Sequence, residues 1–233
     1  MQSIVTKFRT IRCLGLISVY VVLVHRLKVR FGLYSACKVM NYTLKGPFFK
    51  KSNLPISSLP AVSDWDYNLS LFSKIRIPSD KNPPNWLSNV TTGQSFKLPL
   101  KPWWKISDFN KEIGDIKFIW ELSRMEWVLA FAQRARNGND HALVKLNDWL
   151  TDWVETNPTY AGPNWKCGQE ASIRVIHLFC ASMVLGQERN TSPALQELIK
   201  LHLRRITPTI AYAIAQNNNH GTTEAAALFI GGT

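Results

Sequence analysis

The stretch DIKFIWELSRMEWVLAFAQRAR, residues 115–136, decides the fold class of this chain. Its apolar residues recur at the spacing of one helix face: Ile116, Ile119, Trp120, Met125, Trp127, Val128 and Phe131. The polar run NGND at 137–140 ends the pattern. We therefore expect a helix over residues 115–136, with Glu121 and Arg124 three positions apart on one face.

Helical patterns follow to the end of the chain, separated by short loops. The further helices are expected over residues 141–155, 165–185, 193–215, and from Asn219 or His220 through Ile230. Pro208 should kink the third of these. Five helices joined by short loops predict an all-α body of antiparallel hairpins packed in layers. The sequence stops directly after the last helix, at Gly231-Gly232-Thr233, so we expect a truncated chain.

Residues 36–104 have a different composition, because most of the prolines lie there: Pro47, Pro55, Pro60, Pro78, Pro83, Pro84, Pro99 and Pro102. Proline lacks an amide donor and fixes its own φ, which excludes long helices. We expect a loop-rich, extended segment with a few short strands over the helical body. The expected organisation is then a basic segment 1–35, the loop-rich segment 36–104 and a helical domain 105–233.

The net charge of +12 belongs to the N-terminal part of the chain. Residues 1–51 contain ten Lys and Arg residues and no Asp or Glu, so the remainder is close to neutral. Such a segment suits a membrane surface, an acidic glycan or a nucleic acid, or is simply a solvated tail. Nothing in the sequence interleaves aromatic and basic residues as nucleic-acid-binding modules do, so we expect no nucleic-acid partner.

The apolar run at residues 13–24 follows basic residues, as in a signal peptide. It is too short to span a bilayer, and basic residues at 26–30 occupy the place of a cleavage region. We favour an uncleaved interfacial helix over about residues 4–31, which could contact a membrane peripherally. The alternative is a first helix packed on the body. A cytoplasmic or membrane-associated location is favoured over a periplasmic one.

Four cysteines in 233 residues show neither CxxC nor zinc-ligand spacing. They therefore predict neither a disulfide framework nor a metal site, and no cofactor is expected. The oligomeric state is left open.

Four motifs occur in a recognisable order: Asp115-Ile116-Lys117 with Trp120-Glu121-Leu122-Ser123-Arg124, Trp153 with Asn157-Pro158, Gly162-x-Asn164-Trp165 before Glu170-Ala171-Ser172-Ile173-Arg174, and Asn218-Asn219-His220 with Glu224-Ala225-Ala226-Ala227-Leu228. Over about residues 100–233 the chain resembles the N-terminal helical, alginate-lyase-like domain of the heparinase II/III-like polysaccharide lyases. The resemblance implies an incomplete (α/α) toroid, which in the family precedes a β-sandwich domain.

The resemblance also implies an activity, the β-elimination of uronic-acid-containing polysaccharides. By the motif, Asn219 would bind the uronate carboxylate and His220 would lie beside it as a catalytic residue. The family's catalytic Tyr and second His would fall beyond Thr233. The implied fragment thus holds half of a site, which leaves open whether it is active. The alternative is a non-catalytic helical module that binds an acidic glycan.

The chemistry suits these residue types. β-Elimination removes the sugar C5 proton, so donors must first neutralise the neighbouring carboxylate. An Asn amide, an imidazole and a helix N-terminus supply such donors, and His can take a proton near neutral pH. The competing interpretation of Asn217-Asn218-Asn219 is a polar helix cap. Glu224 either holds His220 at i+4 or is an ordinary first-turn acid.

Further substrate-binding candidates are weaker. Asn218 belongs to the same polar run. Glu170 and Arg174 are four apart on one face and form either a substrate contact or a structural ion pair. Trp165 could stack on a sugar ring or belong to the core.

Overall fold

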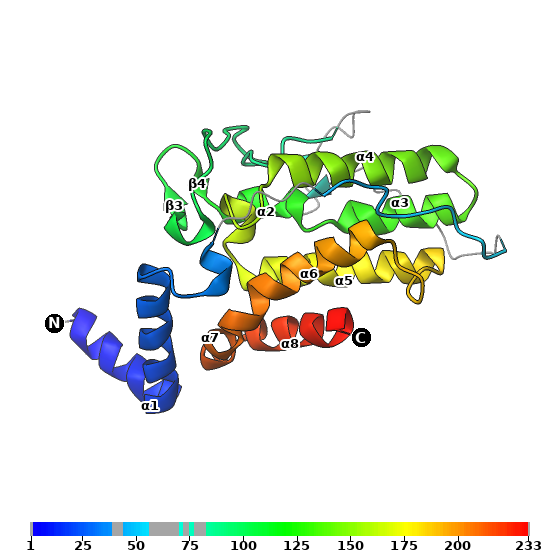
Figure 1. The fold of residues 1–233 in the computed structure, drawn as a ribbon. Helices are drawn as coiled ribbons and strands as arrows, with labels where there is room; N and C mark the ends of the chain where they lie inside the picture. The colour runs from blue at the N-terminus through cyan, green and yellow to red at the C-terminus, as the bar shows by residue number, and fades with distance from the viewer. Residues whose placement is uncertain (1, 39–43, 56–69, 72–74, 77–82, 233) are drawn as a thin grey trace.

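The computed structural model describes residues 2–38, 44–55, 70–71, 75–76 and 83–232. This part of the chain is mostly helical, which confirms the all-α class (Figure 1). Two short antiparallel pairs accompany the helices, β1 (Ser70–Leu71) with β2 (Ile75–Arg76) and β3 (Phe109–Asn110) with β4 (Gly114–Asp115). The helices are α1 (Gln2–Arg30), α2 (Lys117–Ser123), α3 (Glu126–Arg136), α4 (Asp140–Thr156), α5 (Gly168–Leu185), α6 (Pro193–Ile206), α7 (Ile210–Ala215) and α8 (Asn219–Gly232). Short 3-10 turns are η1 (Ser35–Cys37), η2 (Trp103–Lys105), η3 (Pro163–Trp165) and η4 (Thr207–Thr209).

The helix expected over 115–136 is two helices, so that prediction was wrong. Met125 adopts a left-handed conformation with φ of 65° between α2 and α3, and its side chain is completely buried. The turn places the Trp127 indole so that its N–H donates to Leu122 O at 3.1 Å. Apolar periodicity does not reveal such a turn, because the buried residues on both sides keep helical spacing.

The other helix boundaries follow local chemistry. Asn139 caps α4 by accepting from the Ala142 amide, and Gly186 ends α5 with φ of 68°. The start expected at residue 165 is displaced to Gly168, because residues 163–165 form η3. Pro208 does more than kink the helix expected over 193–215: η4 separates α6 from α7.

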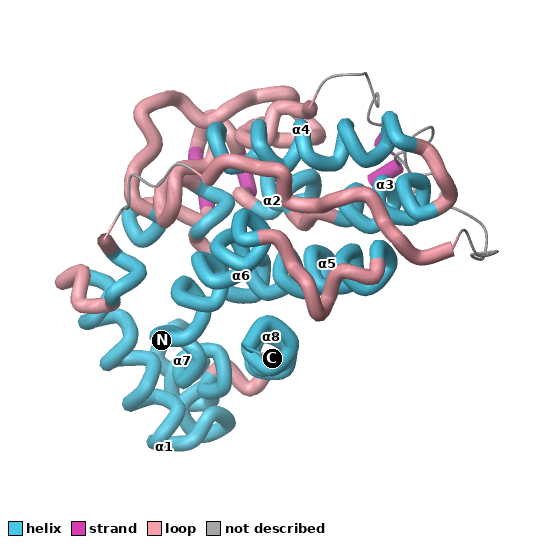
Figure 2. Tube along the Cα trace, turned by 45° about the vertical axis from the view of Figure 1, so that its right-hand side comes forward, coloured by secondary structure: helices cyan, strands magenta, loops and turns pink. Residues whose placement is uncertain are grey.

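The body is built from stacked helix pairs, with α3 and α4 on one side, α5 and α6 in the middle, and α7 and α8 beyond them (Figures 1 and 2). Aromatic side chains fill the core between the layers. Trp86, Trp127, Trp149 and Phe131 lie with ring centroids 5.1–5.9 Å apart in tilted and edge-on contacts. Such contacts stabilise a core beyond the area that they bury.

The proline-rich segment shares this core where it is described. Phe48 and Phe49 are buried, and both of their amides donate to Asn147 Oδ1, at 2.7 and 3.0 Å. Lys50 exchanges two backbone hydrogen bonds with the Gln187 side chain. Residues 44–55 contain no helix or strand and pack on the helical body through these contacts. Residues 39–43, 56–69, 72–74 and 77–82 of the segment lie outside the described part.

Helix α1 agrees with the expected N-terminal helix and bends at Gly15, where φ is 79°. It lies at one end of the molecule, where it packs against α7 (Figures 1 and 2). The contact is a ring stack of His25 on Tyr212, with centroids 3.7 Å apart and planes within 5°. Within the described residues, no helix is both long enough and apolar enough to cross a bilayer.

Candidate functional site

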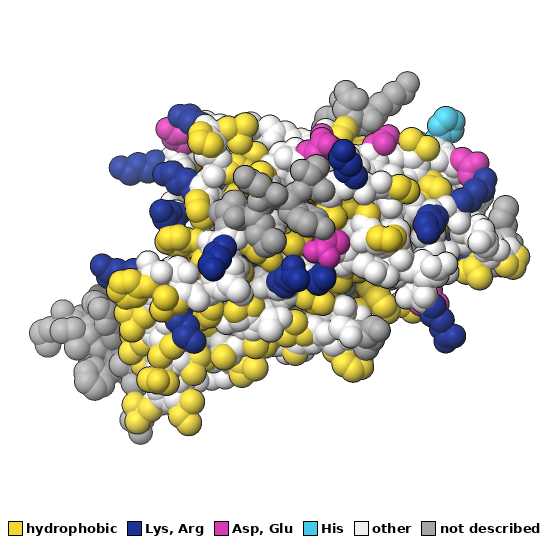
Figure 3. All heavy atoms as spheres, in the orientation of Figure 1, with side chains coloured by type: hydrophobic (Ala, Val, Ile, Leu, Met, Phe, Trp, Pro, Cys, Tyr) yellow, Lys and Arg dark blue, Asp and Glu magenta, His cyan; other side chains and the backbone are white. Residues whose placement is uncertain are grey.

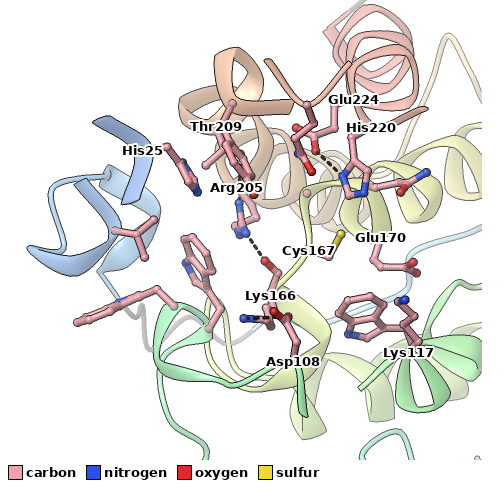
Figure 4. Close-up of a pocket in the computed structure, with 18 of the residues that line it drawn as sticks. His25, Asp108, Lys117, Lys166, Cys167, Glu170, Arg205, Thr209, His220 and Glu224 are labelled. Carbon is pink, nitrogen blue, oxygen red and sulfur yellow. Dashed lines mark hydrogen bonds and ion pairs between the residues drawn. The ribbon is translucent and has the colours of Figure 1, made fainter. Parts of the chain in front are cut away.

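A cavity of about 420 Å³ opens where α1, η2, α2, α7, α8 and the first turn of α5 meet. Its volume falls in the range of small-ligand sites. Aromatic residues form part of its wall, including Trp104, Trp120 and Tyr212. Charged side chains from separate elements also line it: Asp108, Lys117, Arg124, Lys166, Glu170, Arg205 and Glu224 (Figure 4).

The first turn of α8 contributes His220 and Glu224. Four residues apart on one helix face, they place His220 Nδ1 3.7 Å from Glu224 Oε1 (Figure 4). The distance is that of an ion pair and is longer than a hydrogen bond. Glu224 is 3% exposed, and its Oε2 has no hydrogen-bond partner in the described structure. A buried carboxylate oxygen of this kind is available to a donor brought by a ligand.

The N-terminal end of α5 faces the same cavity. A Cβ on Gly168 would lie 2.5 Å from Glu224 Oε1, so a larger residue here would displace the carboxylate from this helix end. Helix N-termini carry unpaired amides and a partial positive charge. Burial raises the pKa of the Cys167 thiol, and the amides of Gln169 and Glu170 act in the opposite direction. This end of α5 therefore lies beside the Glu224 carboxylate and the Cys167 thiol.

Arg124 fixes the start of α5 to α2. Its Nε and Nη2 donate to the two carboxylate oxygens of Glu170 at 2.8 and 2.9 Å, and its Nη1 donates to Glu121 at 2.7 Å. The hydrogen bond with Glu170 is the main cause that raises the pKa of Arg124, whereas burial raises the pKa of Glu121. The sequence predicted the Glu121–Arg124 pair but not the hydrogen bonds from Arg124 to Glu170.

Two further cations are anchored in the cavity wall. Arg205 is buried, donates to Trp165 O at 2.8 Å, and places its guanidinium 3.6 Å from the centroid of Trp103. Burial lowers its pKa to about 10. Lys166 donates to Ile106 O at 2.6 Å and lies 3.2 Å from Asp108. Held in this way, both cations lose little rotamer entropy when an anion arrives.

Helix α1 closes the cavity with His25. Its Nδ1 lies 3.0 Å from the Tyr34 hydroxyl, and its ring stacks on Tyr212. Burial, followed by the charges of Arg205 and Arg26, lowers the pKa of His25 to about 4. His25 is therefore neutral at pH 7. Burial also raises the pKa of the Tyr212 hydroxyl, which stays protonated.

The predicted site residues divide into two groups. His220, Glu224 and Glu170 come together in the cavity. Asn218 and Asn219 are exposed and do not line it. Asn218 Oδ1 accepts the His220 amide at 3.0 Å, which is the role of a helix cap. Its side chain thus follows the competing interpretation, and Asn219 is the first residue of α8.

The expectation that Arg174 and Trp165 bind substrate is not supported, because both side chains lie in the core. Arg174 is completely buried and donates to His202 Nε2 at 2.9 Å and to Asn164 O at 2.7 Å. Its guanidinium carbon lies 5.2 Å from the ring centroid of Trp153 and 5.8 Å from that of Trp165. Glu170, the ion-pair partner expected for Arg174, binds Arg124 instead.

Several cavity residues were not singled out from the sequence, notably His25, Lys117, Lys166, Arg205 and Tyr212. Lys166 and Cys167 directly precede α5, so a helix start placed at Gly168 would have drawn attention to them. His25 and Tyr212 gave no comparable signal, because their meeting depends on how α1 packs on α7.

Among the described residues, no group of three or more His, Cys, Asp or Glu side chains is arranged to hold a metal ion. No family model, curated protein or solved structure matches this chain.

Proposed function

We propose that the chain is the helical module of a polysaccharide lyase, and that its cavity binds a uronate unit of an acidic polysaccharide. The observation that carries the proposal is the convergence of His220 with Lys117 and the N-terminal end of α5 on one cavity. A carboxylate would be neutralised by the amides and the ammonium group, and His220 would lie beside it as a proton acceptor. We further propose that the hairpins α3–α4, α5–α6 and α7–α8 form part of an (α/α) toroid.

Aromatic residues support a sugar ligand. Trp104 and Trp120 line the cavity with the cations, and the apolar faces of sugar rings pack on such side chains. Glu224, whose Oε1 lies 3.7 Å from His220 Nδ1, would order the His220 ring beside the ligand.

A second candidate is a non-catalytic module that binds the same glycan. The exposed position of Asn219 favours it, because the residue expected to bind the carboxylate does not line the cavity. In that case the cavity recognises uronate through α5 and Lys117 without removing a proton.

The two candidates are separated by measuring binding and product together. The full chain is incubated with alginate, polygalacturonate, heparin and chondroitin sulfate. Binding is followed by calorimetry, and cleavage by the ultraviolet absorbance of unsaturated uronate. Lys117→Gln should weaken binding about fivefold or more, as for one lost charge-assisted contact. Lys111→Gln, an exposed lysine outside the cavity lining, is the matched control.

His220→Ala should abolish any absorbance change and leave most of the binding, whereas exposed His141→Ala should change neither. If the protein binds a polymer but no polymer gives the ultraviolet absorbance of unsaturated uronate, the result supports the non-catalytic module. If no polymer binds, or if Lys111→Gln weakens binding as much as Lys117→Gln, the assignment of the cavity is refuted.

A further inference from the structure

The outer face of α1 carries a continuous apolar stripe. Its members are exposed by half or more and follow one another at spacings of three or four residues: Leu16, Tyr20, Leu23, Leu27 and, directly after the helix, Phe31. This spacing puts them on one side of the helix. Figure 3 shows hydrophobic side chains gathered on this end of the molecule.

The inner face of α1 is already occupied. His25 and Val29 line the cavity, and His25 stacks on Tyr212 of α7. The stripe points away from that contact, since residues 23 and 27 are each two positions from residue 25 and lie on the opposite helix face. Within the described chain, therefore, the inner face packs on the body and the outer face is solvent-exposed.

Basic residues border the stripe. Arg26, Lys28 and Arg30 are exposed, and the geometry of 3.6 residues per turn places Lys28 on one flank and the two arginines on the other. Long basic side chains in these positions can bury their stems and keep their charges at the level of lipid headgroups. The surrounding sequence adds to this charge, because residues 1–51 contain ten Lys and Arg and no acidic residue.

We propose that α1 binds the surface of an anionic lipid bilayer, with the apolar stripe Leu16–Phe31 inserted between the headgroups and the three flanking cations against lipid phosphates. The combination of a narrow apolar stripe with cationic flanks is the arrangement of helices that lie in the membrane interface. Charge argues against a second copy as the occupant, because two such helices would bring like charges together. The inference is independent of what the cavity binds.

The test is flotation of the full-length protein with vesicles of phosphatidylcholine and phosphatidylserine in a 3:1 ratio, compared with phosphatidylcholine alone. Binding is expected to the anionic vesicles and to fall as salt is raised, because salt screens the flanking charges. Each cation near an anionic surface is worth roughly a fivefold change in partitioning. The triple variant Arg26→Gln, Lys28→Gln, Arg30→Gln should therefore lower binding on the order of 100-fold.

The stripe itself is tested with Leu23→Ser, Leu27→Ser, which replaces side chains that are 53% and 55% exposed. The matched control is Val144→Ser, Met183→Ser, whose side chains are 57% and 55% exposed on α4 and α5. The α1 variant should lose vesicle binding by about tenfold or more, and the control should keep it. Circular dichroism establishes that both variants retain the helical fold.

Equal vesicle binding by the α1 variant and the wild type would overturn the proposal. Absence of binding to the anionic vesicles would also overturn it. If light scattering then showed a dimer that Leu23→Ser, Leu27→Ser dissociates, the stripe would bind a second copy instead. Glycan binding by the cavity is measured without lipid. The result of that assay therefore does not change the interpretation of the vesicle-binding assay.

Discussion

Replacing Arg124 by Met should remove the charge that holds α2 against the start of α5 and keep most of the apolar stem. Two carboxylates would lose their counter-ion, Glu170 with a side chain 4% exposed and Glu121 with one 12% exposed. Breaking a largely buried pair costs about 3–5 kcal/mol, because the remaining charge is left desolvated. We expect a loss of that size in the free energy of unfolding at pH 7.5.

The assay is urea unfolding followed by tryptophan fluorescence, with the slope against urea checked for constancy. Arg204→Met is the control, because Arg204 is 49% exposed and lies 3.8 Å from Glu197. A surface pair of this kind contributes about 0–1 kcal/mol. Adding Glu170→Gln to Arg124→Met should restore about 1 kcal/mol or more of the free energy of unfolding, since it removes one buried charge that has lost its counter-ion.

The pH dependence gives a second readout. A carboxyl group whose pKa is raised in the folded state binds protons more readily there than in the unfolded state. Its cost to stability is therefore present at high pH and relieved as the pH falls through the folded pKa. Burial already raises the pKa of Glu121, and loss of Arg124 removes the opposing charge. The stability difference between wild type and Arg124→Met should shrink from pH 7.5 to pH 5. A loss below about 1 kcal/mol at pH 7.5 would refute the reasoning, as would a loss that is constant with pH.

Two further predictions concern the core. Burial, followed by the charge of Arg174, lowers the pKa of His202 to about 3. Between about pH 6.5 and 3 the unfolded chain thus binds more protons than the folded chain. The free energy of unfolding therefore decreases as the pH is lowered across that window. His202→Gln should reduce the slope of unfolding free energy against pH by up to about 1.4 kcal/mol per unit below pH 6, measured by urea unfolding with His141→Gln as the control. Gly186→Ala should cost about 1–2 kcal/mol or more, because Gly186 has φ of 68° and a Cβ there would collide with Leu54; an unchanged midpoint would contradict this.

Local patterns were sufficient to predict which stretches from residue 115 onward are helical. Apolar spacing, Asn139 as a cap and Gly186 as a terminator act within one turn of chain, so α4, α5 and α8 lie close to their expected positions. The break at Met125 was not predictable in this way. A left-handed methionine is strained locally, and it is stabilised by complete burial among residues distant in sequence.

The candidate site was less predictable than the helices. Glu170 and Arg174 have ideal spacing for an ion pair, and yet Glu170 binds Arg124 in a bidentate contact while Arg174 enters the core beside His202. Spacing along one helix determines which residues share a face. Which partner each of them takes depends on the neighbouring helix, and that information is not local.

Carboxylate recognition in this cavity must be supplied by groups other than Asn219, if it occurs as proposed. The side chain of Asn219 is exposed at the start of α8, whereas Lys117 and the first residues of α5 line the same cavity as His220. Donors stabilise developing charge only when they point at the reacting group, so a donor outside the cavity contributes little. A comparison of Lys117→Gln with Asn219→Ala therefore separates recognition inferred from the sequence motif from recognition inferred from the geometry. Lys117→Gln should cause the larger loss of uronate binding.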